Sequence, residues 1–444
     1  MARILFITPY YPPEKAAPAV RLSETAARLA RRGHQVTVLT TVPNYPTGIV
    51  PPEYRGHLVQ QETRDGVRVV RVWSYTSPNK GFLRRIVAQL SFGCLAPILG
   101  GRAVGRPDVI IVESPPLFDA IAARMLAWYR RCPFIFLVSD LWPESAVQLG
   151  MLRNRTLIWL AEWLERSTYR RAGLIWAVTE GIRQSLLQRG VPAEKVFLLT
   201  NGVDTEKFRP RSQAQARAEL GWDNRFTLLY AGTHGLSQGL TTLLDAADRL
   251  RDQPDIHVVL VGDGAEKADL IAQARKRDLQ NITFLDPLPH DRVPLLLASA
   301  DICLVPLRKL PLFEGALPSK MYEMMACARP MILGVEGEAR RMVEQEAGAG
   351  LAVEPENADA LVAAVLYLRE HPEVAEAMGR RGRAFVEARF ERAQLTAQLE
   401  VRITALLAEN QPISSVGMRL APIRFPTTRH PSRMGASPIP TDEL

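Results

Sequence analysis

The chain has 444 residues, of which 47% are hydrophobic and 23% are charged. This composition is typical of a globular protein and excludes a chain that is disordered throughout. A chain of this length exceeds what one hydrophobic core usually serves, so two domains are expected. The formal net charge of +8 indicates an anionic partner. Phosphate-bearing substrates, acidic lipid surfaces and nucleic acids all fit that description.

The four cysteines are far apart in the sequence, at positions Cys94, Cys132, Cys303 and Cys327. They form no CxxC pair and no cluster with histidine, so neither a zinc site nor a disulfide framework is predicted. The first ten residues resemble a buried strand and lack the apolar core and cleavage site of a signal peptide. The expected location is therefore the reducing cytoplasm.

Apolar, β-branched runs alternate with helical segments along the first half of the chain. Such runs are typical of parallel strands that helices cover on both faces. A helix is predicted at residues 22–32, after a proline-rich loop. The predicted strands of this half are 2–8, 35–41, 67–73, 107–114, 133–140 and 173–179.

Two helical segments in this half combine apolar and basic residues, at 80–106 and 151–171. Residues 86–101 are mostly apolar, with Arg84, Arg85 and Arg102 around them. No segment reaches the ~18 uninterrupted apolar residues of a membrane span. The pattern is equally consistent with a helix on a membrane surface and with a buried helical hairpin that has basic ends.

The second half repeats the alternation, with a helix predicted near 240–251. Its predicted strands are 226–232, 256–264, 281–287, 301–307, 330–335 and 350–355. The two halves therefore predict an α/β fold of two doubly wound, Rossmann-like units, with a break near 200–212. A further helix is predicted at 387–409, and the proline-rich, net positive stretch after it is expected to be a disordered tail.

Ligands of open α/β sheets bind outside the carboxyl ends of the strands, so the loops after strands matter most. The proline-rich loop after the first strand leads through the small residue Ala17 to Arg21, which could meet a phosphate. Asp140 comes just after the apolar run at 133–138 and could bind sugar hydroxyls, while Trp142 packs on a ring. A helix cap at Asp140 and a core position for Trp142 fit the local sequence equally well.

A turn of small residues, 230–240, connects the strand that begins at residue 226 to the next predicted helix. Its backbone N–H groups could cradle a phosphate, and it contains Gly232, Thr233, His234 and Gln238. No GxGxxG motif is present, which argues against a dinucleotide-dependent dehydrogenase.

The segment at 317–330 contains Pro318-Ser319-Lys320 and, one turn later, Glu323. Pro318 suits the first turn of a helix, where the free N–H groups attract anions. Lys320 adds a positive charge, and the carboxylate of Glu323 could hold two neighbouring hydroxyls. Together they suit a ribose diphosphate, although a capped helix with a surface lysine fits the segment taken alone.

These positions together resemble the GT-B glycosyltransferases of family 4, which are retaining enzymes with nucleotide-sugar donors. The resemblance covers roughly residues 1–410. Its most specific markers are Asn201-Gly202-Val203-Asp204 with Phe208, Tyr230-Ala231-Gly232, Gly262-Asp263-Gly264, and Pro318-Ser319-Lys320 with Glu323. Within the family, the chain most resembles the colanic-acid and O-antigen sugar transferases, fucosaminyltransferases among them.

The resemblance implies a GT-B fold, in which two Rossmann-like domains face a central cleft. Residues 1–205 would form the acceptor domain and 206–386 the nucleotide-sugar domain. Residues 387–410 would form a helix that crosses back to the N-terminal domain, followed by the tail at 411–444.

The resemblance also implies the site and its ligands. The implied catalytic residues are Asp140 and Glu314, and the implied donor-binding residues are Lys320, Glu323, Ser319, Gly232, Thr233, His234, Gln238, Arg21 and Ala17. The expected donor is a UDP-sugar, and neither a metal nor another cofactor is expected. The expected acceptor is lipid-linked or a saccharide of cell-surface polysaccharide synthesis, at the inner face of the plasma membrane.

Three positions depart from the family's pattern. The first glutamate of its EX7E motif would stand at Gly315, and Glu314 is out of register by one residue. The usual cations of the diphosphate site are replaced by Thr233 and Gln238, and the usual histidine before Asp140 is Ser139. The phosphate charge would then fall on Lys320, Arg21 and the backbone, with Arg308 and Lys309 as nearby substitutes.

Three other functions fit parts of the sequence. A sugar-nucleotide epimerase would share the GT-B fold, but the chain lacks a convincing acid–base set for it. A non-catalytic nucleotide-sugar sensor would tolerate the missing glutamate. Nucleic-acid binding rests on the charge alone, because no basic motif with stacking aromatics is present.

Overall fold

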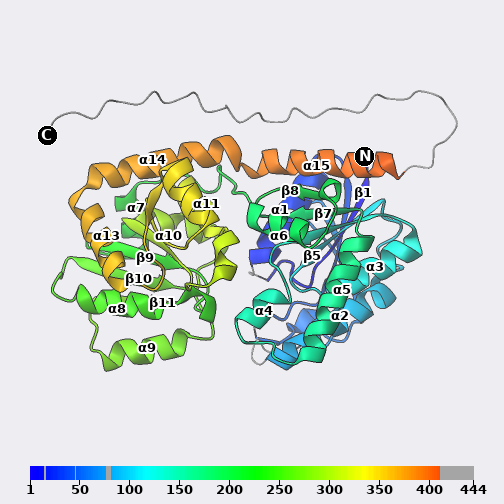
Figure 1. Ribbon diagram of the computed structural model, residues 1–444, viewed down its shortest axis with the longest axis horizontal. Helices are drawn as coiled ribbons and strands as arrows, with labels where there is room; N and C mark the ends of the chain where they lie inside the picture. The colour runs from blue at the N-terminus through cyan, green and yellow to red at the C-terminus, as the bar shows by residue number, and fades with distance from the viewer. Residues whose placement is uncertain (15–16, 46, 77–81, 411–444) are drawn as a thin grey trace, which may run out of the picture. The chain divides into compact units, whose positions relative to one another are not determined.

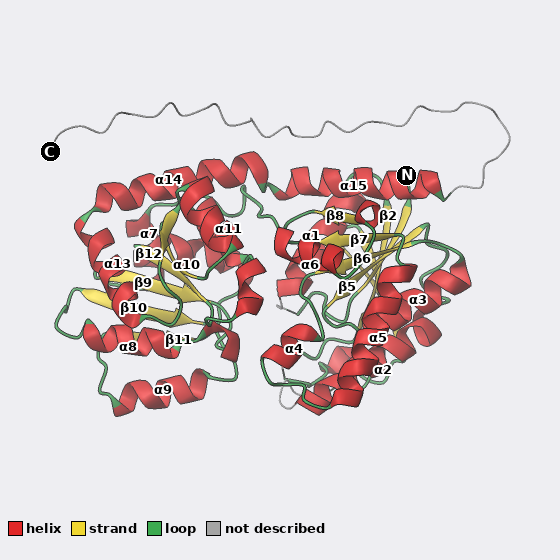
Figure 2. Cartoon of the chain, in the orientation of Figure 1, coloured by secondary structure: helices red, strands yellow, loops and turns green. Residues whose placement is uncertain are grey.

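The computed structural model describes residues 1–14, 17–45, 47–76 and 82–410 (Figure 1). The tail predicted at 411–444 lies outside the described residues, as do Lys15 and Ala16 of the proline-rich loop. The described chain contains two sheets, each with helices around it (Figure 2).

The first sheet has eight strands in the order β3-β4-β2-β1-β5-β6-β7-β8. All neighbours are parallel except β3, which pairs antiparallel with β4 at the edge. The strands are β1 (Arg3–Ile7), β2 (Gln35–Thr41), β3 (Val59–Arg64), β4 (Val67–Val72), β5 (Val109–Ser114), β6 (Phe134–Val138), β7 (Leu174–Ala177) and β8 (Val196–Leu198). Every strand predicted in this half is confirmed. The sequence missed β3 because it is a polar edge strand, and β8 because it has only three residues.

Six α-helices connect these strands: α1 (Ala17–Arg31), α2 (Phe82–Gly100), α3 (Asp119–Arg130), α4 (Glu144–Gln148), α5 (Arg155–Arg171) and α6 (Glu180–Gln188). Because α2 is one continuous helix, the alternative of a helical hairpin at 86–101 is excluded. Gly93 of α2 lies so close to the backbone oxygen of Phe118, just before α3, that a side chain there would overlap it. The helix therefore packs directly against the start of α3.

The second sheet has six strands in the order β11-β10-β9-β12-β13-β14, and every pair is parallel. The strands are β9 (Phe226–Ala231), β10 (Ile256–Val261), β11 (Ile282–Leu285), β12 (Ile302–Pro306), β13 (Met331–Gly334) and β14 (Gly350–Ala352). They confirm the strands predicted in this half. The α-helices that follow are α7 (Gln213–Leu220), α8 (Thr241–Arg249), α9 (Lys267–Lys276), α10 (Val293–Ser299), α11 (Lys320–Ala326), α12 (Glu338–Arg340), α13 (Ala358–Glu370) and α14 (Pro372–Arg389).

The last described helix, α15 (Arg392–Glu409), packs into the core of the first sheet and lies beside α1 (Figure 1). Its buried residues in that core are Leu395, Leu399, Ile403 and Leu406. Phe390, just before it, belongs instead to a core cluster of the second sheet. The single helix predicted at 387–409 is therefore wrong at its start, since the chain leaves α14 at Phe390 and begins α15 two residues later.

Removing the side chain of Leu399 tests this packing, because the residue is fully buried. We expect Leu399→Ala to lower the free energy of unfolding by about 2–5 kcal/mol, the usual cost of such a cavity. Denaturant unfolding measures the change. Val401→Ala on the same helix is the matched control, since Val401 is 54% exposed and should change stability by under ~0.5 kcal/mol. Equal effects of the two substitutions would show that α15 is not docked.

Candidate functional site

Lys320 is the first residue of the short helix α11, at a site formed by the carboxyl ends of the second sheet. Ser319 is the N-cap and makes no capping hydrogen bond with its side chain. The prediction that Pro318 stands in the first turn is wrong, since the helix begins two residues later. The full positive charge at this helix start is that of the Lys320 side chain.

The ammonium group of Lys320 lies over an aromatic ring. Its Nζ is 4.3 Å from the ring centroid of Tyr230, near the end of β9. A Cβ atom on Gly232 would overlap the same Nζ, so glycine leaves the space that the ammonium occupies. Tyr230 is held in place because its hydroxyl donates to the Thr233 carbonyl at 2.6 Å. Within the described residues, Lys320 has no ion pair, so its charge is available to a ligand.

Burial sets the ionisation of Lys320 and Glu323. It lowers the pKa of Lys320 to about 8, against the opposing effect of the Glu323 carboxylate. Burial also raises the pKa of Glu323 to about 7, opposed by the positive charges of Lys320 and Lys207. Both groups therefore change charge close to neutral pH, and each depends on the other.

The loop after β9 is joined to the loop after β10 by backbone hydrogen bonds. The N–H of Gly232 donates to the Val261 carbonyl at 2.9 Å, and the N–H of His234 donates to the Asp263 carbonyl at 2.9 Å. These two N–H groups are therefore not free, and the predicted phosphate cradle is wrong for them. Thr233 is exposed and Gln238 is partly buried.

His234 is fully buried below this loop. Its ring lies 5.8 Å from that of Tyr230 and 6.4 Å from that of Phe284. Neither ring nitrogen has a hydrogen-bond partner among the described residues. Burial, together with the charges of Lys267 and Lys320, lowers the pKa of His234 to about 4, so the ring is neutral at physiological pH. Its contact with a donor stays a prediction.

Arg21 is engaged within the protein. It forms an ion pair with Glu113 and donates hydrogen bonds to Ser139 Oγ and Asn201 Oδ1, both at 3.1 Å. Ser139 in turn donates to Glu113 Oε1 at 2.7 Å. Ser139 thus belongs to a charged network at the ends of β5 and β6, in place of the family's histidine. Ala17, the other residue predicted nearby, is the first residue of α1.

Glu113 was not predicted as a functional residue, although the sequence contained a signal for it. It is the only charged residue within the strand segment Val109–Ser114. A carboxylate near the carboxyl end of a buried strand requires a cation, and Arg21 is that cation.

Asp140 follows β6 and is partly buried. Burial raises the pKa of its carboxyl group, while hydrogen bonds from the Ser145 side chain and the Leu141 N–H counteract this. Trp142, two residues later, makes an edge contact with Phe118 at 5.4 Å between ring centroids.

Glu314 lies in a short 3-10 turn, Pro311–Gly315, and its side chain is exposed. At the next residue, Gly315, where the family has a glutamate, a side chain would be tightly crowded. A Cβ on Gly315 would be 3.1 Å from Cα of Gly181, and a Cβ on Gly181 would be 2.6 Å from Cα of Gly315. The two glycines therefore allow a close approach of the two segments.

The two cations proposed as substitutes at the phosphate site have acidic partners. Arg308 Nε lies 3.4 Å from Glu356, and Lys309 Nζ lies 2.5 Å from Glu354. Lys320 is therefore the predicted cation that keeps an unpaired charge. A metal-binding group of three or more His, Cys, Asp or Glu residues is not found in the described part of the chain.

Comparisons with known proteins agree with this architecture. Residues 17–202 match the glycosyl transferase 4-like domain, and residues 212–385 match the glycosyl transferases group 1. WcaI of Escherichia coli K12, named as a glycosyl transferase of colanic acid biosynthesis, is 30% identical over 379 residues. That alignment covers 82% of this chain and 92% of WcaI. The chain belongs to the family 4 glycosyltransferases.

Two further proteins extend the comparison. A GDP-mannose-dependent phosphatidylinositol monomannoside mannosyltransferase of Mycobacterium tuberculosis is 24% identical, over 90% of this chain and 97% of its own. The structure of Anabaena HepE with UDP-glucose is similar with a TM-score of 0.68 at 18% identity, covering 91% of this chain and all of HepE. The predicted GT-B fold is confirmed, and the chain is a glycosyltransferase, as the resemblance implied.

The dependence of Lys320 on Glu323 gives a direct test of the site's electrostatics. We expect Glu323→Gln to lower the pKa of Lys320 further, because the neighbouring carboxylate favours the charged ammonium. The pH dependence of Lys320 acylation, followed by mass spectrometry, reports this pKa. The reference is the exposed Lys276, whose extent of acylation should be the same in both proteins. An unchanged Lys320 profile in the variant would contradict the electrostatic coupling.

Proposed function

We propose that this glycosyltransferase transfers a sugar from a UDP-linked donor to a lipid-linked or saccharide acceptor in cell-surface polysaccharide synthesis. The observation that carries the donor assignment is the unpaired, partly buried ammonium of Lys320 beside the carboxyl group of Glu323. A diphosphate would restore the full charge of Lys320, and two ribose hydroxyls could donate to Glu323.

The remaining predicted donor residues have supporting roles in this proposal. Gly232 provides the space for Lys320, and buried His234 supports the loop from below. Thr233, Gln238 and Ser319 would contact the donor directly. Because Arg21 is bound to Glu113, it would position the loops near Ala17 and Ser139 more than it would carry phosphate charge.

Asp140 is the proposed catalytic residue on the acceptor side. Its carboxyl group, whose pKa is raised by burial, lies two residues before Trp142 in the sequence. There it could hold an acceptor hydroxyl. We propose retention of configuration by a front-face reaction, in which the leaving diphosphate takes the acceptor proton. Glu314 is the second proposed catalytic residue, and its side chain is exposed. The anomeric configuration of the product, read by NMR, tests retention.

The names of two relatives support the proposed acceptor and pathway. WcaI is named for colanic acid biosynthesis, and the mycobacterial relative for a mannoside of phosphatidylinositol. Both names support a glycoconjugate product, and the second supports a lipid-linked acceptor. The donor of the mycobacterial relative is GDP-mannose, whereas HepE was solved with UDP-glucose, so a donor panel must contain both nucleotides.

Thermal shift against UDP-, GDP- and dTDP-sugars tests the donor assignment. We expect UDP-sugars to raise the melting temperature and Lys320→Ala to abolish the rise. Loss of one charge-assisted contact costs about 1.5–3 kcal/mol, which is roughly a 10- to 150-fold loss of affinity.

Lys276→Ala is the matched control, since Lys276 is an exposed lysine of the same half of the chain. It should leave the shift unchanged. A full shift in the Lys320→Ala variant would refute the role of Lys320, and a shift with GDP-sugars alone would refute the UDP assignment.

The affinity for a UDP-sugar should depend on pH with a maximum between the pKa values of the two groups, about 7 and about 8. Below the lower value Glu323 gains a proton and accepts fewer hydrogen bonds. Above the upper value Lys320 loses its charge. A UDP-sugar does not titrate in this range, so calorimetry across it reports the protein groups.

Two variants assign the limbs of this profile. Glu323→Gln should remove the fall at low pH, and Lys320→Ala the fall at high pH. A profile that keeps both limbs in both variants would assign the titration to other groups.

A further inference from the structure

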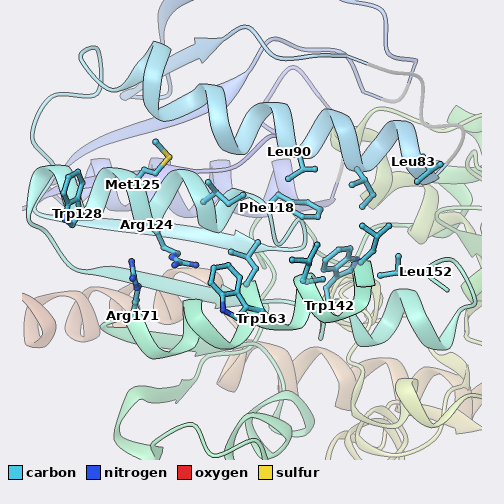
Figure 3. Close-up of a pocket in the computed structure, with 16 residues that line it drawn as sticks. Leu83, Leu90, Phe118, Arg124, Met125, Trp128, Trp142, Leu152, Trp163 and Arg171 are labelled. Carbon is cyan, nitrogen blue, oxygen red and sulfur yellow. The ribbon is translucent and has the colours of Figure 1, made fainter. Parts of the chain in front are cut away.

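An apolar groove of about 640 Å³ lies on the first half of the chain, between α2, α3 and α5 (Figure 3). Its volume is within the ~300–1,000 Å³ usual for sites that bind small molecules. Leu83, Leu152 and Trp142 lie at one end, and Trp128, Arg124 and Arg171 at the other (Figure 3). The proposed transfer reaction uses none of the lining residues directly.

The side chains on and beside the groove are unusually exposed for apolar residues. Trp128 is 80% exposed, Leu83 68% and Trp163 51%. Exposed apolar residues also include Ile98 of α2, Tyr129 of α3 and Trp159 of α5. Exposed apolar residues gathered on three neighbouring helices indicate an interaction site, and tryptophan and tyrosine are typical of the boundary between lipid and water.

Two arginines lie together at one end of the groove. The charged ends of Arg124 and Arg171 point toward one another (Figure 3), and the charge of Arg171 adds to burial in lowering the pKa of Arg124. Arg124 donates to Ser167 Oγ at 2.8 Å, a neutral partner. Neither arginine forms an ion pair with any carboxylate that the structure describes. An anion between them would relieve their repulsion.

We propose that this face docks the protein on a membrane that contains anionic phospholipid, with an acyl chain in the groove and the lipid phosphate between Arg124 and Arg171. The dimensions fit. Leu157 and Arg171 both line the groove and are separated by about 21 Å along α5, at 1.5 Å per residue. The hydrocarbon of one leaflet is about 15 Å thick, so an acyl chain of that length fits along the groove.

The topology separates the phosphate of this lipid from the acceptor. Asp140 follows the carboxyl end of β6, whereas Arg171 precedes the amino end of β7, and the two strands are parallel neighbours. The arginine pair therefore lies toward the edge of the sheet opposite the proposed catalytic residue. A phosphate held there belongs to a docking lipid and not to a molecule that receives sugar at Asp140.

Other occupants fit the charges or the packing less well. The stretch at 411–444 is net positive and would repel the arginine pair. The window Leu83–Gly100 of α2 is long and apolar enough to cross a membrane by length and composition, and only 22% of it is buried. However, Gly93 and Gly100 of α2 pack closely on the rest of the fold, which favours a helix that lies on the membrane.

Vesicle binding tests the docking. The full chain should co-sediment with vesicles of phosphatidylcholine and phosphatidylglycerol, and only weakly with phosphatidylcholine alone. Arg124→Gln/Arg171→Gln should weaken binding roughly thirty-fold, from about 1 kcal/mol for each basic residue near an anionic surface. The matched control is Arg275→Gln/Arg380→Gln, which removes the same charge from exposed arginines elsewhere and should have little effect. Equal losses in both pairs would overturn the proposal in favour of unspecific attraction.

Brominated acyl chains test the groove itself, because bromine quenches nearby tryptophan fluorescence. Vesicles with brominated phosphatidylglycerol should quench the wild type, and Trp163→Phe should remove much of that quenching. Trp222→Phe, in the other half of the chain, should not. Absence of quenching on bound vesicles would overturn the assignment of an acyl chain. Inhibition of vesicle binding by low concentrations of inorganic phosphate would identify a site for the free anion and also overturn it.

This docking site rests on the proposed function, because it specifies how the enzyme would reach its membrane. Membrane docking and donor binding can nevertheless be tested separately. Lys320→Ala should lose the UDP-sugar shift and keep vesicle binding. Arg124→Gln/Arg171→Gln should lose vesicle binding and keep the UDP-sugar shift, which also shows that this variant is folded. Loss of both properties in either variant would contradict the independence of the two sites.

Discussion

The proposed donor site depends on the ammonium group of Lys320, which is partly buried and has no ion pair with the described acidic residues. A buried cation is costly unless something compensates it, and in the described chain Lys320 has only the face of Tyr230 and the more distant charge of Glu323. A bound diphosphate would supply the missing negative charge. We therefore propose that the site binds most favourably when the substrate supplies this charge.

The surrounding structure can be understood as support for this lysine. Gly232 leaves room for the ammonium, and the hydrogen bonds between the loops after β9 and β10 fix the floor on which it rests. The other cations near the expected site are neutralised: Arg21 by Glu113, Arg308 by Glu356 and Lys309 by Glu354. The arginine pair of the groove also has no ion pair with the carboxylates that the structure describes, and there we propose a lipid phosphate.

All strands except β3 and β8, the two Rossmann-like units and the family could be predicted from the sequence, because apolar runs and loop motifs are local signals. It could not predict contacts between distant residues. The Glu113–Arg21–Ser139 network joins three separate elements, and the near contact of Gly181 with Gly315 explains a missing glutamate only once the backbone is known. The start of α11 was misplaced because proline suits several positions at a helix start. The groove was anticipated only as an apolar helix with basic ends, since its walls come from three helices.

Measuring the pKa of Lys320 with and without a UDP-sugar is the best test of whether this lysine holds the donor phosphate. NMR of the side-chain nitrogen, assigned with Lys320→Arg, would follow the titration. The account predicts a pKa near the value set by burial, about 8, in the free protein and a clear rise when the diphosphate is bound. A pKa that a bound UDP-sugar does not change would contradict the claim that Lys320 holds the donor phosphate.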